Sequence, residues 1–224
     1  MKNLIIIGAG ETASLAYEYF TNDSDYNIIA FAISEKFILD NQNMFLNLPL
    51  ISLENLQNIF NRYDYEIFVA ISGDKLGYYR KSIYDFLKNK GYKFASYISS
   101  NSFVWKNVEI GENCFIMPNN VLHPFCKIGN NVIIWGSNDI GHRSIIRDHC
   151  CITSNVVVAG YCDIGEHTFI GINSSISDGL KIAKDNFITL GSTITSNTCE
   201  NKIYRGNPAR ALKIPAKKFL KIKI

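Results

Sequence analysis

The sequence predicts a small α/β domain with a parallel sheet over residues 1–97, followed by a parallel β-solenoid over residues 98–224. Two observations support this division. The first part alternates short apolar runs with segments of helical apolar spacing, whereas the second part repeats an aliphatic residue at a fixed interval. With 224 residues, of which 47% are hydrophobic, the chain has enough apolar side chains for one domain and a solenoid.

The first part begins with an apolar run that ends in a glycine-rich loop, and a segment with helical apolar spacing follows. This order predicts a strand–loop–helix unit. Further strands and helices alternate after it, which favours a small parallel sheet. The expected strands cover residues 3–7, 28–32, 67–71 and 94–98, and the expected helices cover residues 12–20, 53–60 and 78–87.

The second part has a period of six. Every sixth residue from Ile98 to Ile194 is aliphatic, seventeen times in succession. Neither the helical period nor strand alternation gives a strict six. We therefore expect each hexad to supply one short strand and one corner of a triangular coil, with three hexads in each 18-residue turn.

Two other positions of the hexad agree with a coil. The fourth residue after each aliphatic is mostly small or compact, as at Cys114, Asn120 and Ser144, and should fill the narrow interior. Glycine often follows the aliphatic directly, and we expect these glycines to form tight corners because glycine tolerates unusual dihedral angles. They are Gly111, Gly129, Gly141, Gly165 and Gly171.

The composition excludes several classes of function. A net charge of +3 does not indicate nucleic-acid binding, and no basic stretch is interleaved with stacking aromatic residues. Eight lysines and arginines follow Glu200 without an acidic residue; a solvated segment is the simplest interpretation, and a site for coenzyme phosphates or an anionic membrane surface is the alternative. No apolar run reaches the ~18 residues of a membrane span, and no cleavage site follows the first strand, so we expect a cytoplasmic protein.

The cysteines and histidines do not predict a metal site. Four of the six cysteines occupy the interior position of the hexad, where they act as small hydrophobic residues, and CxxC spacing is absent. His149 and His167 lie one turn apart. A metal pair is conceivable there, but a stacked pair on the coil surface is the simpler interpretation.

The chain resembles the left-handed parallel β-helix acyltransferases with hexapeptide repeats. Within them it is similar to the sialic-acid and bacillosamine acetyltransferase-like group, whose members place a small nucleotide-binding domain before the coil. The resemblance rests on the segments LIIIGAGETA, VAISG, NDIGHRSIIRDHCCI, GINSSI and YRGNPARAL. It implies a left-handed coil, acyl-coenzyme A (usually acetyl-CoA) as co-substrate, no metal, and a homotrimer with sites between neighbouring subunits.

The glycine loop reads GxGxxA, and between a strand and a helix such a loop lets backbone N–H groups approach a phosphate. A purely structural turn is the alternative. The resemblance implies that this domain binds the nucleotide part of a nucleotide-linked sugar, with further contacts from two strand-end loops. The usual acidic pair after the second strand is not present. The expected substrate-binding residues are Gly8, Gly10, Glu11, Ser34, Glu35, Ser72, Gly73, Asp74 and Lys75.

His142 corresponds to the active-site histidine of the resembled group. It lies two residues after an inward aliphatic, so it should be outside the core, and Gly160 one turn later should leave room beside the ring. A neutral imidazole can take a proton from an attacking amine or hydroxyl; an ordinary surface histidine is the alternative. Arg143 stands where the group has a carboxylate and offers no acceptor. Asn138 and Asp139 are therefore the candidates to orient the ring.

The resemblance also assigns the acyl donor to the coil. A backbone N–H near Gly160 is expected to stabilise the oxyanion. Cys151 stands at the position of another histidine of the group, which contacts substrate or acyl donor. The expected coenzyme-binding residues are Cys151, Gly160, Gly171, Ile172, Asn173, Gly191 and Arg205.

Together these features predict an N-acyltransferase, most simply an acetyltransferase, that modifies the amino group of a nucleotide-linked amino-dideoxy sugar for a surface glycan such as lipopolysaccharide. O-acetylation of a sugar, for example sialic acid, is one alternative. A solenoid kept as a binding or assembly module, with Arg143 and Cys151 marking a decayed site, is another.

Overall fold

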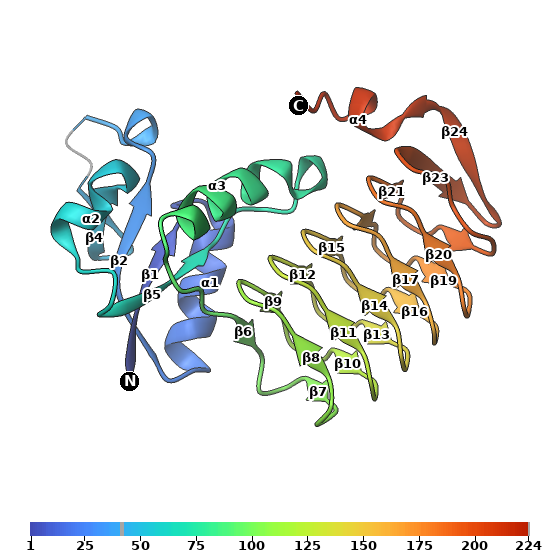
Figure 1. The fold of residues 1–224 in the computed structure, drawn as a ribbon, viewed down its shortest axis with the longest axis horizontal. Helices are drawn as coiled ribbons and strands as arrows, with labels where there is room; N and C mark the ends of the chain where they lie inside the picture. The colour runs from blue at the N-terminus through green and yellow to red at the C-terminus, as the bar shows by residue number, and fades with distance from the viewer. Residues whose placement is uncertain (41–42, 224) are drawn as a thin grey trace. The chain divides into compact units, whose positions relative to one another are not determined.

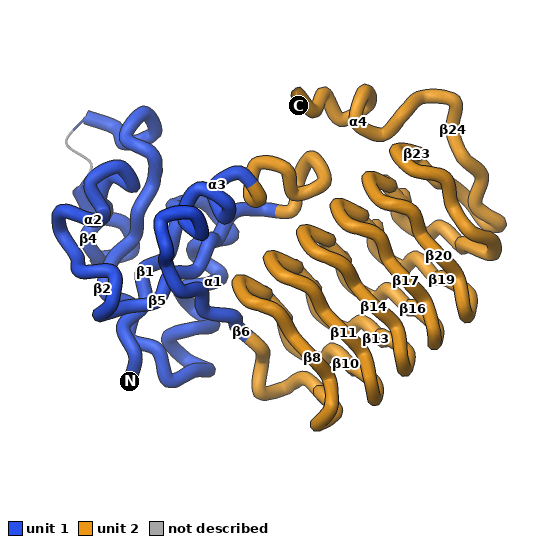
Figure 2. Tube along the Cα trace, viewed as in Figure 1, with its two compact units in different colours: residues 1–72, 82–97 blue, residues 73–81, 98–224 orange. Residues whose placement is uncertain are grey.

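A computed structural model describes residues 1–40 and 43–223 of the chain. The chain forms two compact units, Met1–Ser72 with Ser82–Tyr97, and Gly73–Lys81 with Ile98–Ile224 (Figure 2). We call them the α/β unit and the coil unit. The sequence analysis placed Gly73–Lys81 in the first domain, whereas the structure groups this segment with the coil.

The α/β unit contains a five-stranded sheet in the order β3-β4-β2-β1-β5. Strands β4, β2, β1 and β5 are parallel, as predicted, and β3 pairs antiparallel with β4. The sequence did not predict β3 and β4, because Pro49 makes this segment look unlike a strand. The strands are β1 (Lys2–Ile7), β2 (Tyr26–Ile33), β3 (Met44–Phe45), β4 (Leu48–Ser52) and β5 (Tyr65–Val69).

Helices accompany the sheet largely where the apolar spacing predicts them. The helix α1 buries Ala13, Ala16 and Phe20, and the Phe20 ring meets Phe68 edge-on at 5.0 Å. The predicted helix over 53–60 is a 3-10 turn followed by a single α turn. The helices are α1 (Glu11–Asn22), a 3-10 helix at Glu35–Phe37, another at Leu53–Asn55, α2 (Leu56–Ile59), a third 3-10 helix at Lys75–Gly77, and α3 (Tyr78–Asn89), whose residues after Lys81 belong to the α/β unit.

The predicted strand over residues 94–98 is confirmed only in part. Phe94 makes only an isolated parallel bridge to Ile67, and the strand β6 is restricted to Tyr97–Ile98. Phe94, Ala95 and Tyr97 are all buried. The apolar run therefore reflects burial on the way into the coil as well as short pairing at its two ends.

Up to β22, the coil unit consists of two-residue strands that stack in three parallel sheets; the longer β23 and β24 extend one of these sheets and pair antiparallel with each other (Figure 1). Partners in neighbouring turns are 18 residues apart, as with Asp139 between Val121 and Val157, so the predicted triangular coil is confirmed. We name the sheets by their strands: sheet I (β7, β10, β13, β16, β19, β22), sheet II (β8, β11, β14, β17, β20) and sheet III (β6, β9, β12, β15, β18, β21, β23, β24).

The bounds of the coil elements follow the hexad. They are β7 (Phe103–Val104), β8 (Glu109–Ile110), β9 (Phe115–Ile116), β10 (Val121–Leu122), β11 (Lys127–Ile128), β12 (Ile133–Ile134), β13 (Asp139–Ile140), β14 (Ile145–Ile146), β15 (Cys151–Ile152), β16 (Val157–Val158), β17 (Asp163–Ile164), β18 (Phe169–Ile170), β19 (Ser175–Ile176), β20 (Lys181–Ile182), β21 (Phe187–Ile188), β22 (Thr193–Ile194), β23 (Lys202–Gly206), β24 (Ala209–Pro215) and α4 (Ala216–Phe219).

The coil interior is filled as the repeat predicts. The aliphatic residue that ends each strand is buried from Ile116 onward, and the interior cysteines pack with these aliphatics in one cluster. Polar side chains in the interior form hydrogen bonds with residues of the neighbouring turns along the coil axis. Asn138 Nδ2, for example, donates to Asn120 Oδ1 at 3.0 Å, while Asn138 Oδ1 accepts from the Val156 amide at 2.8 Å.

The corner glycines serve a different purpose from the one expected. From Ile110 to Ile188, the left-handed φ falls on the third residue after the aliphatic, at residues such as Asn131 (59°), Arg143 (60°) and His167 (58°). Glycine directly after the aliphatic is required by close approach of the next turn. A Cβ on Gly165 would lie 2.6 Å from the Lys184 amide nitrogen, and one on Gly141 would lie 2.6 Å from the Ala159 carbonyl carbon.

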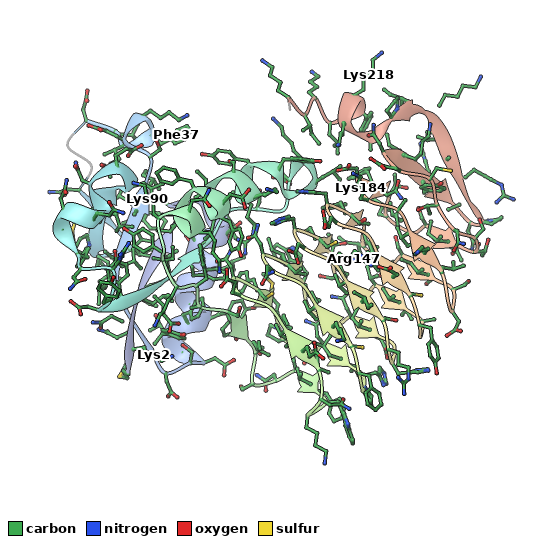
Figure 3. The ribbon with its side chains drawn as sticks, in the orientation of Figure 1. Lys2, Phe37, Lys90, Arg147, Lys184 and Lys218 are labelled. Atoms are coloured by element: carbon green, nitrogen blue, oxygen red, sulfur yellow. The ribbon has the colours of Figure 1, made fainter. Side chains whose placement is uncertain are left out.

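The three sheets differ in the side chains that they direct outward. Sheet III carries apolar residues such as Phe115, Ile133 and Cys151, which are buried. Sheet II carries ion pairs, including Arg147 with Asp163 at 2.7 Å and Lys184 with Glu200 at 3.4 Å (Figure 3). Sheet I leaves large apolar side chains exposed, as described below. None of the described helices is long and apolar enough to cross a membrane.

We predict that Gly165→Ala destabilises the coil by ~1–3 kcal/mol, because the added methyl group meets the backbone of the next turn. Ser175→Ala is the control, since Ser175 is exposed on β19 and does not have a left-handed φ. Thermal unfolding measures both. Equal melting temperatures for Gly165→Ala and wild type would show that the turns separate to accommodate a side chain.

Candidate functional site

Three of the predicted substrate loops meet at one edge of the sheet in the α/β unit. The neighbouring strands β2, β1 and β5 are parallel, so their carboxyl ends share an edge. The loops Gly8–Glu11, Ser34–Glu35 and Ala70–Ser72 follow these ends directly. Ligands of open α/β sheets bind outside this edge. Gly73, Asp74 and Lys75 belong to the coil unit and are described below.

The two glycines of the first loop are not equivalent. Gly8 has φ of 134°, and a Cβ there would lie 2.6 Å from the Ala70 carbonyl oxygen, so the fold itself requires glycine. Gly10 has a φ of −114° and nothing within 4 Å of a Cβ. Gly10 is also the N-cap of α1 and has no side chain that could cap the helix. The Ala13 amide donates to the Gly10 carbonyl at 2.9 Å, so the amides of Glu11 and Thr12 are the ones in the first turn of α1 that are available to an anion.

Glu54 fixes the second loop, and the sequence analysis missed it. The Ser34 hydroxyl donates to Glu54 Oε1 at 2.7 Å, and the Glu35 amide donates to Oε2 at 2.9 Å. Burial raises the pKa of Glu54, but these hydrogen bonds outweigh it and hold the pKa below its usual value. A charged carboxylate therefore holds this loop. Only the fold brings Glu54, from the 3-10 helix at Leu53–Asn55, to residues 34–35.

His142 lies on the corner that follows β13 in the coil unit, and its side chain is exposed. The imidazole rests directly on Gly160 of the next turn: a Cβ on Gly160 would lie 2.6 Å from His142 Cε1 and 2.9 Å from Nδ1. Any larger residue at position 160 would displace the ring. The backbone thus defines one side of the imidazole and leaves the other side to solvent.

Aromatic residues determine the surroundings of His142. The Tyr161 ring meets the imidazole edge-on, with centroids 4.9 Å apart and an angle of 82°. Arg143 turns the other way and places its guanidinium 4.4 Å from the centre of the Phe125 ring. Tyr161 was missed, although its position directly after Gly160 in the hexad is readable from the sequence.

The two residues expected to orient His142 have other partners in this structure. Asn138 occupies the interior position of its hexad, where its side-chain amide donates to Asn120 Oδ1 and accepts from the Val156 amide. Asp139 points outward from sheet I, where its Oδ1 lies 3.2 Å from His123 Nε2. The contacts that do reach the imidazole come from Gly160 and Tyr161.

The residues expected to bind coenzyme lie mainly on the corner between sheets III and I, so they and His142 flank sheet I. Ile172 and Asn173 are exposed there, and Gly191, one turn beyond Asn173, has a φ of 64° and open space around it. Arg205 is exposed on β23. Gly171 is buried, and a Cβ there would lie 2.8 Å from the Thr189 carbonyl carbon, so its glycine is structural.

Cys151 is buried, which disfavours the predicted contact with the acyl donor. It faces outward from sheet III but is only 3% exposed, because Gly73 covers it. A Cβ on Gly73 would lie 2.5 Å from the Cys151 Sγ. Burial raises the pKa of the Cys151 thiol to about 12, with the Arg80 charge acting in the opposite direction. In this structure Cys151 packs against Gly73.

A ladder of polar side chains holds Gly73–Lys81 against the coil. His167 Nδ1 donates to the Leu76 carbonyl at 2.9 Å, and the His167 ring stacks on Tyr78 with centroids 4.1 Å apart. The Tyr78 hydroxyl donates to Asp185 Oδ1 at 2.6 Å, and Lys217 pairs with Asp185 Oδ2 at 2.8 Å. We call this segment with its partners the clamp.

The clamp continues toward the start of the coil. His149 stacks on His167 at 4.9 Å, and its Nδ1 lies 3.0 Å from Asn131 Nδ2. Arg80 is buried and donates from Nη2 to the Asn113 carbonyl at 2.7 Å. Both histidines are therefore buried, not on the coil surface as expected. Among residues 1–40 and 43–223, no three His, Cys, Asp or Glu side chains cluster to hold a metal ion.

We predict that the clamp weakens as the pH falls below the usual histidine pKa of 6.5. Burial lowers the pKa of His167, although Leu76 and Asp185 oppose this, so the folded protein favours neutral imidazole. The stability that this provides is complete above pH 6.5 and is lost as the pH falls toward the lowered pKa. As the pH is lowered across this range, the melting temperature of the His167→Phe variant should fall less steeply than that of the wild type. An unchanged slope would place the titration elsewhere.

Residues 107–138 match the sequence profile of the bacterial transferase hexapeptide (six repeats) family. A mutant of perosamine N-acetyltransferase from Caulobacter crescentus, solved with CoA and GDP-perosamine, aligns with a TM-score of 0.83 and 19% identity over 96% of this chain and 98% of that one. This chain has the fold of that acetyltransferase.

Two further structures show the same likeness. The acetyltransferase domain of PglB from Neisseria gonorrhoeae, in complex with acetyl coenzyme A, aligns with a TM-score of 0.82 and 20% identity over 94% of this chain and 99% of that one. WeeI from Acinetobacter baumannii aligns with a TM-score of 0.71 and 20% identity over 95% and 100%. The predicted combination of an α/β unit and a left-handed parallel β-helix is thereby confirmed.

Proposed function

We propose that the protein is an N-acyltransferase, in the simplest case an acetyltransferase, that transfers from acyl-coenzyme A to the amino group of a nucleotide-linked amino-dideoxy sugar. The observation that carries the proposal is the exposed imidazole of His142, seated on Gly160 in a coil with the fold of enzymes solved with CoA or GDP-perosamine. Products of this type would enter a surface glycan.

His142 acts as the general base in this proposal. It takes a proton from the amine while the nitrogen attacks the thioester carbonyl and the C–N bond forms. The Ala159 amide donates to the Ile176 carbonyl and the Tyr161 amide to the His142 carbonyl, so the Gly160 amide is the candidate donor to the oxyanion. The C–S bond then breaks, and the thiolate takes the proton from the imidazolium.

The two reactants occupy different parts of the chain. The sugar nucleotide binds at the sheet edge through Gly8, Gly10, Glu11, Ser34, Glu35 and Ser72, with the loop at 34–35 held by Glu54. The acyl donor binds along Ile172, Asn173 and Gly191 toward Arg205. Binding both reactants makes the attack an effectively unimolecular step.

The direct test is an acyl-coenzyme A consumption assay with a panel of nucleotide-linked amino sugars and with free sialic acid. Turnover that requires the sugar amine supports N-acylation. Turnover of sialic acid alone would instead establish sugar O-acetylation, and no turnover with any acceptor would favour a binding module.

We predict that His142→Ala lowers kcat by ~10²–10⁴-fold, the usual loss for a general base. The melting temperature should stay close to that of wild type, because His142 is exposed. His123→Ala is the control, since His123 lies on the preceding turn and pairs with Asp139. Steady-state kinetics compare the variants, and a His142→Ala enzyme with more than about half of the wild-type kcat would remove His142 from the mechanism.

We predict that Gly10→Val weakens sugar-nucleotide binding and leaves acyl-coenzyme A binding unchanged. The fold tolerates the side chain, because Gly10 has an ordinary φ and open space, so the loss reports on the ligand. Calorimetric titration with each ligand makes the comparison. Undiminished sugar-nucleotide affinity would make the glycine loop purely structural, and equal losses for both ligands would indicate a folding defect.

The exposed apolar residues of sheet I and its corner support assembly into a trimer. Phe103, Trp105, Phe125, Val157 and Tyr161 are all exposed, and Val157 is central in the sheet. Large apolar surfaces of this kind mark subunit interfaces. His142 borders this surface, so a neighbouring subunit would close the open side of the imidazole.

We predict that light scattering gives three times the chain mass of 25.3 kDa for the wild type and a smaller mass for Val157→Glu, because the new carboxylate would be buried without a partner. Thr193→Glu, on the last strand of the same sheet, is the control. A fully active monomer would contradict a site shared between subunits.

A further inference from the structure

The charges of the chain are strongly segregated. Residues 201–224 carry +8, whereas the whole chain carries only +3, which leaves −5 for residues 1–200. Neither reactant of the proposed reaction requires so large a concentration of cations at one end. An asymmetry of this kind between parts of a chain points to an anionic surface as partner.

The structure shows that most of these cations are not neutralised. We call residues 202–223, which include β23, β24 and α4, the basic segment. Lys217 is paired with Asp185 in the clamp. The other exposed cations form no ion pair with any described residue; they are Arg205, Arg210, Lys213, Lys218, Lys221 and Lys223. Lys218 lies on the outer side of α4 (Figure 3).

Apolar side chains are exposed between these cations. Leu212 and Ile214 on β24 are each 37% exposed, and Phe219 on α4 is 53% exposed. Lysine and arginine mixed with exposed leucine, isoleucine and phenylalanine are typical of segments that lie at a membrane interface. In such segments the cations bind the lipid phosphates, and the apolar side chains enter the region below the headgroups.

The basic segment is held in place on the coil, so it presents a formed surface. β23 pairs with β21 and with β24. Ala216 is buried against Leu76 and Ile203, and Leu220 and Ile222 pack on the same cluster. Little ordering is therefore needed before binding.

We propose that the basic segment docks the protein on membrane surfaces rich in anionic phospholipids. Coenzyme phosphates alone do not explain it, because they would leave the exposed Leu212, Ile214 and Phe219 without a role. Nucleic acid is disfavoured because Phe219 is the single exposed aromatic residue among residues 202–223, whereas single-stranded nucleic acid is bound by several aromatic side chains on which successive bases stack. The proposal is independent of the proposed acyl transfer.

The test is cosedimentation of the full chain with vesicles of phosphatidylcholine and phosphatidylglycerol, and with vesicles of phosphatidylcholine alone. We expect binding to the anionic vesicles that weakens as salt is raised. Each cation near an anionic surface strengthens binding about fivefold, so Lys213→Glu, Lys218→Glu and Lys221→Glu together should weaken it by at least ~100-fold. Leu212→Ser should weaken binding to the anionic vesicles without changing its salt dependence.

The matched control reverses three exposed lysines elsewhere on the coil, Lys106→Glu, Lys127→Glu and Lys181→Glu, with the same change in net charge. Retained binding in the control and loss in the basic-segment variant support the proposal. Equal losses in both would overturn it, because net charge alone would then explain binding. Wild-type protein that does not bind anionic vesicles would also overturn it. In that case, a raised KM for acetyl-CoA in the basic-segment variant would assign the cations to the coenzyme, and a loss of binding to duplex DNA would assign them to nucleic acid.

Discussion

The close stacking of successive coil turns is the constraint on which the other features of the coil depend. Each turn lies directly on the next in an 18-residue register, with a left-handed residue at every corner and no room for a side chain at positions such as Gly141 and Gly165. A residue two places after an inward aliphatic must then project from the corner, above its equivalent in the next turn. His142 is exposed and rests on Gly160 for this reason, so the geometry of the candidate base comes from backbone packing and needs no carboxylate beside the ring.

The register also gives each side of the coil its own chemistry. Residues 18 apart face the same direction. Side chains of one kind that recur at this interval therefore form a continuous surface along a sheet. Sheet II gathers ion pairs, sheet III gathers apolar residues that the clamp and the basic segment cover, and sheet I keeps its apolar residues exposed beside His142. The repeat therefore places the surface proposed for subunit packing next to the proposed base.

The period of six was sufficient to predict the coil, its interior and the exposure of His142, because those depend only on position within the hexad. It was not sufficient where contacts join residues distant in sequence. The burial of Cys151 depends on Gly73, the fixed loop at residues 34–35 depends on Glu54, and the burial of His149 and His167 depends on Leu76 and Tyr78. The corner glycines were misinterpreted for a related reason: a glycine needed for a dihedral angle and one needed for close approach look the same in a sequence.

The clamp has a consequence for how the chain can be divided. Gly73–Lys81 comes from within the stretch that forms the α/β unit, yet it covers Cys151 and completes the hydrogen bonding of His167 in the coil unit. The polypeptide therefore passes between the two units three times, and cutting it at residue 97 does not separate two self-sufficient modules. A fragment that begins at Ile98 would expose the apolar side of sheet III to water. A chimera that exchanges the α/β unit for another would have to leave these nine residues in place for the coil to stay covered.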